Sequence, residues 1–246
     1  MMMLAALSGM LTGFALGIFG SGGGIIVVPA LIYLLHLPPK EAIAMGLGII
    51  AITAVLTTVH HWRVGNVDWR AAATFGPIGM IGTYAGARLG TVVPVAFQLG
   101  LFAVVMYIAA YRMLRKTAVK VESDHKTHVV LLAAAGIGVG LLAGVVGVGG
   151  GFLIVPALVL LADVPMKRAV GTSLAVVSLN SISGFAGYMG AVTINYTLMG
   201  SFAAVTVLAS FTGARLARRL HAHTLKHAFA WSLVVAATYI MAKSVF

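Results

Sequence analysis

The sequence predicts an all-α integral membrane protein made of two inverted repeats of about five helical segments each, with broken or partial helices at glycine-rich turns. Three observations predict this fold: an apolar composition, a motif that occurs twice, and a one-sided distribution of basic residues. Of the 246 residues, 61% are hydrophobic and only 9% are charged, whereas a soluble domain carries about 25% charged residues. The chain therefore cannot cover a water-exposed surface, and the lipid bilayer is its natural solvent.

The net charge of +11 raises the question of nucleic-acid binding. The basic residues, however, stand in short clusters between apolar runs, and no basic stripe or aromatic RNA-reading motif is found. We therefore expect no nucleic-acid partner, and we expect these clusters to set the orientation in the bilayer. Because the chain has no cysteine, disulfides and thiolate metal sites are excluded. No metal ion or other cofactor is expected.

A motif with six glycines and one proline occurs twice, at an offset of 127 residues. Residues 13–31 and 140–158 are identical at ten of nineteen positions, including all six glycines and the proline. The same offset aligns Gly86-Ala-Arg-Leu89 with Gly213-Ala-Arg-Leu216. A chance match would not hold one register over this distance, so the chain is interpreted as a tandem duplication. The expected units are a first repeat, a cytoplasmic linker and a second repeat, over residues 1–115, 116–127 and 128–246.

Each repeat divides into five apolar segments. Those of the first repeat are 3–19, 24–36, 41–60, 71–92 and 95–114. Those of the second repeat are 128–146, 151–162, 168–188, 197–217 and 224–245. The first segment has no Lys or Arg, so it lacks the charged start of a signal peptide and is expected to stay in the membrane. The second segment of each repeat is too short to cross a hydrocarbon core of about 30 Å. We therefore expect a hairpin of partial helices around each glycine-rich turn.

The basic residues favour inverted halves. If each hairpin returns to the face from which it entered, 13 of the 16 Lys and Arg residues fall on one face. If the hairpin is instead one crossing, the same residues divide eight against eight. Cytoplasmic loops carry an excess of Lys and Arg, so the first arrangement is favoured. It predicts a multi-pass protein of the plasma membrane (the bacterial inner membrane), with both termini outside and the linker in the cytoplasm.

The two glycine runs are candidate substrate sites. Non-helical backbone is tolerated at membrane depth only where protein or a wet cavity satisfies its polar groups. Each run leads into a helix whose first N–H groups are unpaired and carry the positive end of the helix dipole, which favours anions. Inverted repeats would bring two such starts together near the midplane. Tight helix packing is the alternative role for glycine. The candidates are Gly20, Ser21, Gly22, Gly23, Gly24, Gly147, Gly149, Gly150 and Gly151.

The duplicated pattern G-x-x-G-x-G-G-G-x-x-x-V-P-x-L, with Ala169-Val-Gly-Thr-Ser-Leu174 after its second copy, resembles the sulfite exporter TauE/SafE family of membrane permeases. The resemblance covers both repeats. It implies transport of a small sulfur-containing anion, such as sulfite, sulfoacetate or a related sulfonate, without ATP hydrolysis by the permease. The first copy departs from the pattern and reads Ala42-Ile-Ala-Met-Gly-Leu47, so polar ligands can come unequally from the two halves.

Neutral polar residues within the segments are further candidate ligands. Ser173, Asn180 and Ser181 share one helical face, and such donors suit an oxyanion. Helix–helix hydrogen bonding is the alternative role. Thr53 is equivalent to Asn180 at the common offset, and Thr57 follows one turn later, although threonine also bonds its own helix.

Charged and titratable residues near the segment ends are candidates for gating or for attracting the anion. His60 and His61 end one segment and could gate or carry a proton, but an interfacial position also accounts for them. Arg88 and Arg215 are equivalent residues that could attract an anion or extend to the lipid headgroups. The five acids all fall in loops or at segment ends, which suits an anion path because a buried carboxylate would repel the substrate.

We therefore expect a transporter and not an enzyme. One alternative is an intramembrane hydrolase that uses Ser21 with His60 or His61, but Val148 replaces Ser21 in the second copy. Another is a non-transporting membrane scaffold, which would not need paired glycine turns. The expected partners are the bilayer and a small organic or inorganic sulfur oxyanion. The sequence leaves open whether the protein forms a homo-oligomer.

Overall fold

The computed structural model describes residues 2–20, 24–115, 125–160 and 164–245, and these are helical almost throughout. The elements of the first half are α1 (Met2–Phe19), α2 (Gly24–Pro29), the π-helical turn η2 (Ala30–Leu34), α3 (Pro39–Arg63), α4 (Trp69–Val92) and α5 (Val95–Leu114). Those of the second half are α6 (His125–Val146), α7 (Gly151–Leu160), α8 (Met166–Tyr188), α9 (Tyr196–Arg219) and α10 (Ala222–Val245). The all-α class is confirmed. Each predicted segment matches one helix, or α2 with η2 for segment 24–36, with ends within three residues of the prediction. The predicted end of segment 151–162 lies outside the described residues.

Among the described residues, five helices are long and apolar enough to cross a bilayer, judged by length and composition. They are α3, α5, α8 and most of α9 and α10. The helices that follow the glycine runs are much shorter. At about 1.5 Å per residue, α2 with η2, and likewise α7, rises only about 15 Å, half the thickness of the hydrocarbon core. The five long apolar helices support a multi-pass membrane protein, and α2 with η2 and α7, as far as the structure describes them, are too short to cross the bilayer.

Side chains at equivalent positions of the two halves cap the N-termini of α4 and α9. Asp68 accepts hydrogen bonds from the N–H groups of Arg70 and Ala71 at 3.0 and 3.1 Å and thereby caps α4. Asn195, 127 residues later, accepts one from the N–H of Leu198 at 3.0 Å and caps α9. Asp and Asn are favoured at this position because they satisfy N–H groups that have no partner within the helix. The local signal that starts these helices is therefore present in both halves.

Glycines bring α1 against α9 and α6 against α4. A Cβ atom on Gly17 would overlap the carbonyl oxygen of Ser210, and one on Gly144 would overlap that of Thr83. Gly17 and Gly144 are equivalent at the 127-residue offset, and so are Thr83 and Ser210. These are two copies of one helix contact, in which only a hydrogen atom fits between the backbones.

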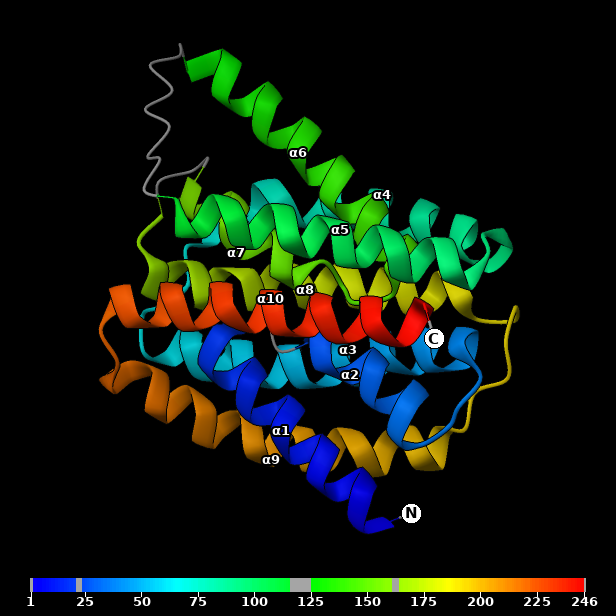
Figure 1. Ribbon diagram of the computed structural model, residues 1–246. Coiled ribbons are helices and arrows are strands. Elements are labelled where there is room, and N and C mark those ends of the chain that lie inside the picture. Colours follow the sequence, from blue (N-terminus) through cyan, green and yellow to red (C-terminus); the bar gives the residue numbers. More distant parts are fainter. Residues whose placement is uncertain (1, 21–23, 116–124, 161–163, 246) are drawn as a thin grey trace.

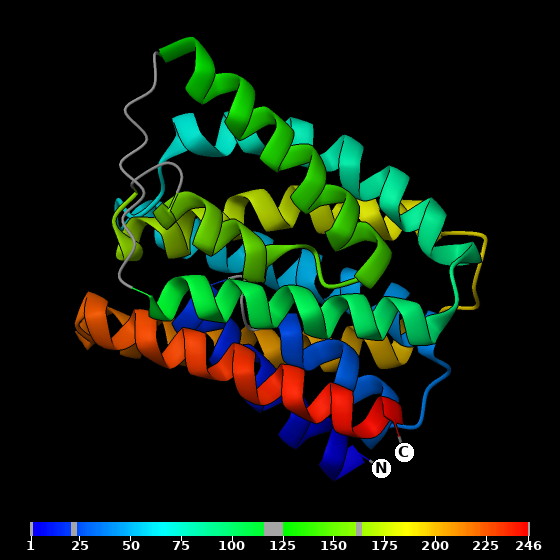
Figure 2. The same ribbon diagram turned by 45° about the horizontal axis from the view of Figure 1, so that its top comes forward.

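The helices α3 and α8 lie side by side in the middle of the molecule and run in opposite directions (Figures 1 and 2). Leu47 of α3 lies beside Gly184 of α8, whereas His61, later in α3, lies beside Gly171, earlier in α8. Since α8 is the equivalent of α3 in the second half, this crossing has the geometry that inverted halves would produce.

The two ends of the bundle collect different parts of the chain. In Figure 1 both termini lie to the right, and the end of α5 and the start of α6 lie to the left. The ends of α3 and α9 and the starts of α4, α8 and α10 are also at the left. Most of the predicted linker lies outside the described residues, and α6 begins at His125, three residues before the predicted boundary.

Candidate functional site

The turn between α6 and α7, called turn 2 here (residues 147–150), has a left-handed backbone. Gly147, Gly149 and Gly150 have φ angles of +78°, +66° and +72°, which glycine adopts without the strain that a Cβ atom would cause. All of these residues are buried. The carbonyl of Gly150 accepts the N–H of Ile154 at 3.0 Å, so α7 starts directly after the turn. The backbone conformation itself therefore requires this glycine run.

The turn between α1 and α2, called turn 1 (residues 20–23), begins in the same way. Gly20 has a φ angle of +70°, close to that of its equivalent Gly147. A Cβ atom on Gly20 would lie 2.7 Å from the carbonyl oxygen of Val170 and 3.1 Å from Oγ of Ser173. This glycine therefore lets α8 approach the turn. The other predicted residues of turn 1 lie outside the described residues: Ser21, Gly22 and Gly23.

The start of α2 lies against turn 2. A Cβ atom on Gly24, the first residue of α2, would lie 3.3 Å from the carbonyl oxygen of Val148. A Cβ atom on Gly46 of α3 would lie 3.7 Å from the carbonyl oxygen of Gly147. Gly151, the first residue of α7, is buried at the end of the same turn. The starts of the two partial helices are therefore brought close together.

One face of α8 passes both turns. Oγ of Ser173 lies beside Gly20, and Oγ of Ser181 occupies the space that a Cβ atom on Gly149 would need. Ser173 donates a hydrogen bond to the carbonyl of Val170 at 2.8 Å. The hydroxyl of Ser181 is buried and has no hydrogen-bond partner among the described residues. Eight residues of helix, about 12 Å, separate the two serines, so α8 presents one hydroxyl to each turn.

Asn180 faces Gly79 of α4. A Cβ atom on Gly79 of α4 would stand 2.6 Å from Oδ1 of Asn180 and 2.9 Å from its Nδ2. The side chain is 1% exposed, and no described residue forms a hydrogen bond with Oδ1. Asn180 is therefore a buried amide, adjacent in sequence to Ser181, on the side of α8 that meets α4.

Thr53 and Thr57 are engaged within the helices. The hydroxyl of Thr53 donates to the carbonyl of Ile49 at 2.8 Å, and that of Thr57 donates to the carbonyl of Thr53 at 2.8 Å. The Thr57 hydroxyl also lies 2.9 Å from Oγ of Ser210 in α9. The structure thus places both hydroxyls in helix and interhelix contacts.

The predicted gating residues separate into two groups. His61 is buried, and the ring of His60 packs against that of Phe211 with 5.8 Å between centroids. Arg88 and Arg215 are exposed. The Arg88 guanidinium donates to the hydroxyl of Tyr84 at 3.2 Å and lies 5.5 Å from its ring, so it belongs to the outer surface of the bundle.

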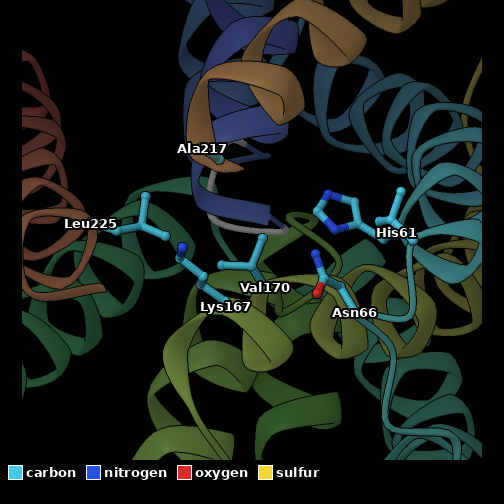
Figure 3. A pocket seen from close by; sticks show the side chains of 7 residues that line it. His61, Asn66, Lys167, Val170, Ala217 and Leu225 are labelled. Carbon is cyan, nitrogen blue, oxygen red and sulfur yellow. The ribbon is translucent and has the colours of Figure 1, made fainter. Parts of the chain in front are cut away.

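A cavity of about 260 Å³ opens at the end of the bundle where α3 ends and α8 and α10 begin. Figure 3 shows side chains from several elements converging on it. They are His61, Val64, Asn66, Lys167, Val170, Ala217 and Leu225.

Acidic groups are remote from the glycine turns in the described part of the chain. Glu41, near the start of α3, accepts a hydrogen bond from the hydroxyl of Thr193. Asp68 caps α4. Both lie at helix starts, so no described carboxylate would repel an anion at turn 1 or turn 2.

A comparison with known families identifies a family that has the expected transport function. The sequence model described as Sulfite exporter TauE/SafE matches residues 5–240. The chain belongs to this family. The resemblance predicted from the duplicated glycine motif is therefore confirmed over nearly the whole chain.

Curated relatives of this TauE/SafE family member are named as probable membrane transporter proteins. One from Xylella fastidiosa is 31% identical over 244 residues, which cover 96% of this chain and 94% of the relative. One from Methanocaldococcus jannaschii is 30% identical over 199 residues, with coverage of 78% and 74%. One from Bacillus subtilis, YdhB, is 27% identical over 234 residues, with coverage of 92% and 94%. No solved structure matches the chain significantly.

The protein is accordingly a membrane transporter and not an enzyme. The hydrolase alternative is excluded by this membership, and its proposed nucleophile, Ser21, lies outside the described residues.

Sequence reasoning missed Asn66 and Lys167, which the fold brings to the cavity beside His61. A partial signal for Lys167 was present, because Lys40 occupies the same position in the first repeat. Nothing comparable marks Asn66, which stands in the loop between α3 and α4.

Proposed function

We propose that this TauE/SafE protein carries a small sulfur-containing oxyanion, such as sulfite, sulfoacetate or a related sulfonate, as a secondary carrier or facilitator. The anion binds near the bilayer midplane between turns 1 and 2, against the hydroxyl-bearing face of α8. The observation that carries the proposal is the buried hydroxyl of Ser181, which has no hydrogen-bond partner in the described part of the chain and faces the left-handed Gly149.

The unpartnered hydroxyl of Ser181 favours a bound acceptor. A buried polar group without a hydrogen bond costs about 1–3 kcal/mol, whereas a hydrogen bond to a charged group contributes about 1.5–3 kcal/mol. An oxyanion at turn 2 would accept this hydrogen bond. The first N–H groups of α7 would add the positive end of a helix dipole at the same place.

The position of the two serines supports a site near the midplane. Ser173 is seven residues after the start of α8, and Ser181 is seven residues before its end. Both therefore lie deep within a helix that is long enough to span the bilayer. Because no described acid lies at the turns, this depth favours an anion over a cation.

The other predicted ligands differ in how readily their side chains could bind the anion. Ser173 supplies a second hydroxyl, which would have to leave the carbonyl of Val170 to bind the anion. Asn180 could offer its amide nitrogen from the neighbouring side of α8. Thr53 and Thr57 are weaker ligands, because their hydroxyls already donate within α3.

The orientation in the proposal follows the basic residues. The halves are inverted, the end of the bundle that holds Arg63, Lys167 and Arg219 is cytoplasmic, and both termini are outside the bacterial inner membrane. Two observations support this arrangement: the antiparallel crossing of α3 and α8, and the preference of Lys and Arg for the cytoplasmic side.

Two serines of α8 provide the test. Ser181→Ala removes the unpartnered hydroxyl, whereas Ser178→Ala removes one that donates to the carbonyl of Ala175 at 2.7 Å. The measurement is thermal stabilisation of the purified protein by sulfite and sulfoacetate, with chloride as the reference anion. We expect Ser181→Ala to weaken sulfoacetate binding about tenfold or more, and Ser178→Ala to change it by less than about twofold, since that hydroxyl keeps its bond within the helix. Equal affinities in the two variants would remove Ser181 from the site.

A further inference from the structure

The cavity at the basic end has the chemistry of an oxyanion subsite. Its lining includes the ammonium group of Lys167, the imidazole of His61 and the amide of Asn66, and none of the described lining residues is acidic. Figure 3 shows His61 and Asn66 on one side of the space and Lys167 on the other, with Val170 between them. Its volume of about 260 Å³ is just below the roughly 300–1,000 Å³ of pockets for drug-sized ligands, which suits a small hydrated ion.

One face of α8 extends from the cavity to the glycine turns. Lys167 and Val170 line the cavity, and the carbonyl of Val170 and the hydroxyl of Ser173 both meet Gly20 of turn 1. Ser181 meets turn 2 further along. These residues recur at spacings of three or four or their multiples, so they lie on one side of the helix. Val170 therefore borders both the cavity and Gly20.

The equivalent residues at the other end of the bundle are packed together. At the 127-residue offset, His61 and Leu225 of the cavity correspond to Tyr188 and Gln98. All four side chains are almost fully buried: His61 and Leu225 are 3% and 1% exposed, and Tyr188 and Gln98 are 0% exposed. The two ends differ in what these side chains meet, because His61 and Leu225 border the cavity, whereas Tyr188 and Gln98 contact Gly90.

Specific contacts hold that second end closed. The hydroxyl of Tyr188 stands so close to Gly90 that no Cβ atom would fit between them. Nε2 of Gln98 donates to the carbonyl of Gly90 at 2.6 Å. Lys40, the equivalent of Lys167, donates to the carbonyl of Thr91. Ala217, the equivalent of Gly90 at the 127-residue offset, instead lines the cavity.

We propose that the cavity is a loading subsite for a small oxyanion at the basic end, open in this conformation, while Tyr188 closes the equivalent space at the opposite end. This inference rests on the proposed transport function and names where the anion first binds. Lys167 supplies the charge that attracts the anion, and the Asn66 amide supplies a hydrogen-bond donor. Exchange between this conformation and one in which the two ends swap states would give the anion access from each side in turn.

The absence of cysteine from the chain allows a direct test of one-sided access. Leu225→Cys places a thiol on the wall of the cavity, and Gln98→Cys places one at the equivalent position beside Gly90. We expect a small water-soluble thiosulfonate reagent to modify Leu225→Cys about tenfold faster or more, since the other thiol is reached only when packed residues open. Equal rates, or a faster reaction at Gln98→Cys, would overturn the inference.

Protection by ligand tests the subsite itself. Sulfoacetate is the probe, because sulfite consumes thiosulfonates. It should slow modification of Leu225→Cys, and Lys167→Gln should weaken this protection about fivefold, the effect of one charge at contact distance in water. Lys167→Arg should retain protection. Arg168→Gln, which removes the neighbouring charge outside the cavity, should leave it unchanged. Absence of protection, or equal losses in Lys167→Gln and Arg168→Gln, would overturn the subsite.

Ser181→Ala separates this inference from the midplane site. It should weaken the thermal stabilisation by sulfoacetate but leave the protection of Leu225→Cys intact. If Ser181→Ala leaves the stabilisation unchanged while Lys167→Gln removes the protection, the midplane site is wrong and the subsite stands. If protection fails while Ser181→Ala still weakens the stabilisation, the subsite is wrong and the midplane site stands.

Discussion

The helices α3 and α8 hold equivalent places in the two halves, but in the described part of the glycine turns hydroxyls of α8, and none of α3, meet the glycines. Ser173 and Ser181 of α8 correspond to Gly46 and Ala54 of α3 at the 127-residue offset. Gly46 is packed against the side chain of Val28, where a Cβ atom would lie 3.0 Å from the nearest methyl group. On this side of the core, the first half therefore offers close packing where the second half offers hydrogen-bond donors.

The two halves share their helix-packing contacts but differ in the polar groups near the glycine turns. They share backbone contacts, such as those of Gly17 and Gly144, which have the same neighbours at the common offset. They differ in polar groups, which an oxyanion site needs only on the side that the anion contacts. The comparison therefore predicts that scaffold substitutions act equally in the two halves, and that binding substitutions act mainly in the second.

The largest effect is expected from Gly17→Val and Gly144→Val. Each side chain would overlap a backbone carbonyl of the neighbouring helix, so the helices must separate. We expect each variant to lose about 3 kcal/mol or more of stability, which lowers the apparent Tm by roughly 10 °C for a chain of this size. Thermal unfolding in detergent measures both.

Gly200→Val is the control, because no atom lies within 4 Å of a Cβ atom at that exposed position of α9. Its Tm should stay near that of the parent protein. A large loss in only one of Gly17→Val and Gly144→Val would show that the two helix contacts are not equivalent.

The next effect concerns turn 2. Gly150→Val forces a branched side chain into a left-handed backbone with a φ angle of +72°, and its Cβ atom would lie 2.7 Å from that of Ala143. Strain of this kind costs about 1–3 kcal/mol, and relief of it would move the turn. We therefore expect sulfoacetate binding to fall below detection in the thermal-stabilisation assay.

The matched control for Gly150→Val is Gly138→Val, in the preceding helix. Gly138 is exposed, and nothing lies within 4 Å of its Cβ position. Binding should persist in Gly138→Val. Normal binding in Gly150→Val would show that turn 2 takes no part in recognition.

A smaller difference should separate Asn180 from its equivalent, Thr53. Asn180→Leu keeps the volume but removes a buried amide whose Oδ1 has no partner, whereas Thr53→Val removes a hydroxyl already bonded to the carbonyl of Ile49. We expect about a tenfold loss of affinity in Asn180→Leu if its amide nitrogen binds the anion, and less than about twofold in Thr53→Val. Similar losses in the two variants would contradict a one-sided site.

The smallest effect is expected at the bundle surface. Trp62 is exposed and packs edge-on against Trp69, with 5.8 Å between ring centroids. Such residues anchor a protein at the membrane interface, so Trp62→Phe should leave anion affinity unchanged. A changed affinity in that variant would connect the interface to the site.

Local sequence predicted the helices and turn 2 well. Segment 95–114 coincides with α5, and the break before Gly151 follows from glycines that adopt positive φ angles. The face shared by Ser173 and Ser181 follows from helical periodicity alone. These features depend on neighbouring residues in the chain, which is why they could be read from one sequence.

Features that depend on distant contacts were not predictable. After Pro29 the chain widens into η2, where the N–H of Leu35 bonds the carbonyl of Ala30, but the equivalent Pro156 stands inside a regular α7. The same kind of limit applies to the cavity. Its closed counterpart depends on Tyr188 and Gln98 packing around Gly90, and no local pattern marks that contact.

Uptake of radiolabelled sulfite into proteoliposomes tests the central claim most directly, with Ser181→Ala and Ser178→Ala reconstituted beside the parent protein. The account predicts saturable uptake that sulfoacetate inhibits and excess chloride does not, strongly reduced in Ser181→Ala and retained in Ser178→Ala. Uptake no greater than in protein-free liposomes, or uptake equal in all three proteins, would contradict it.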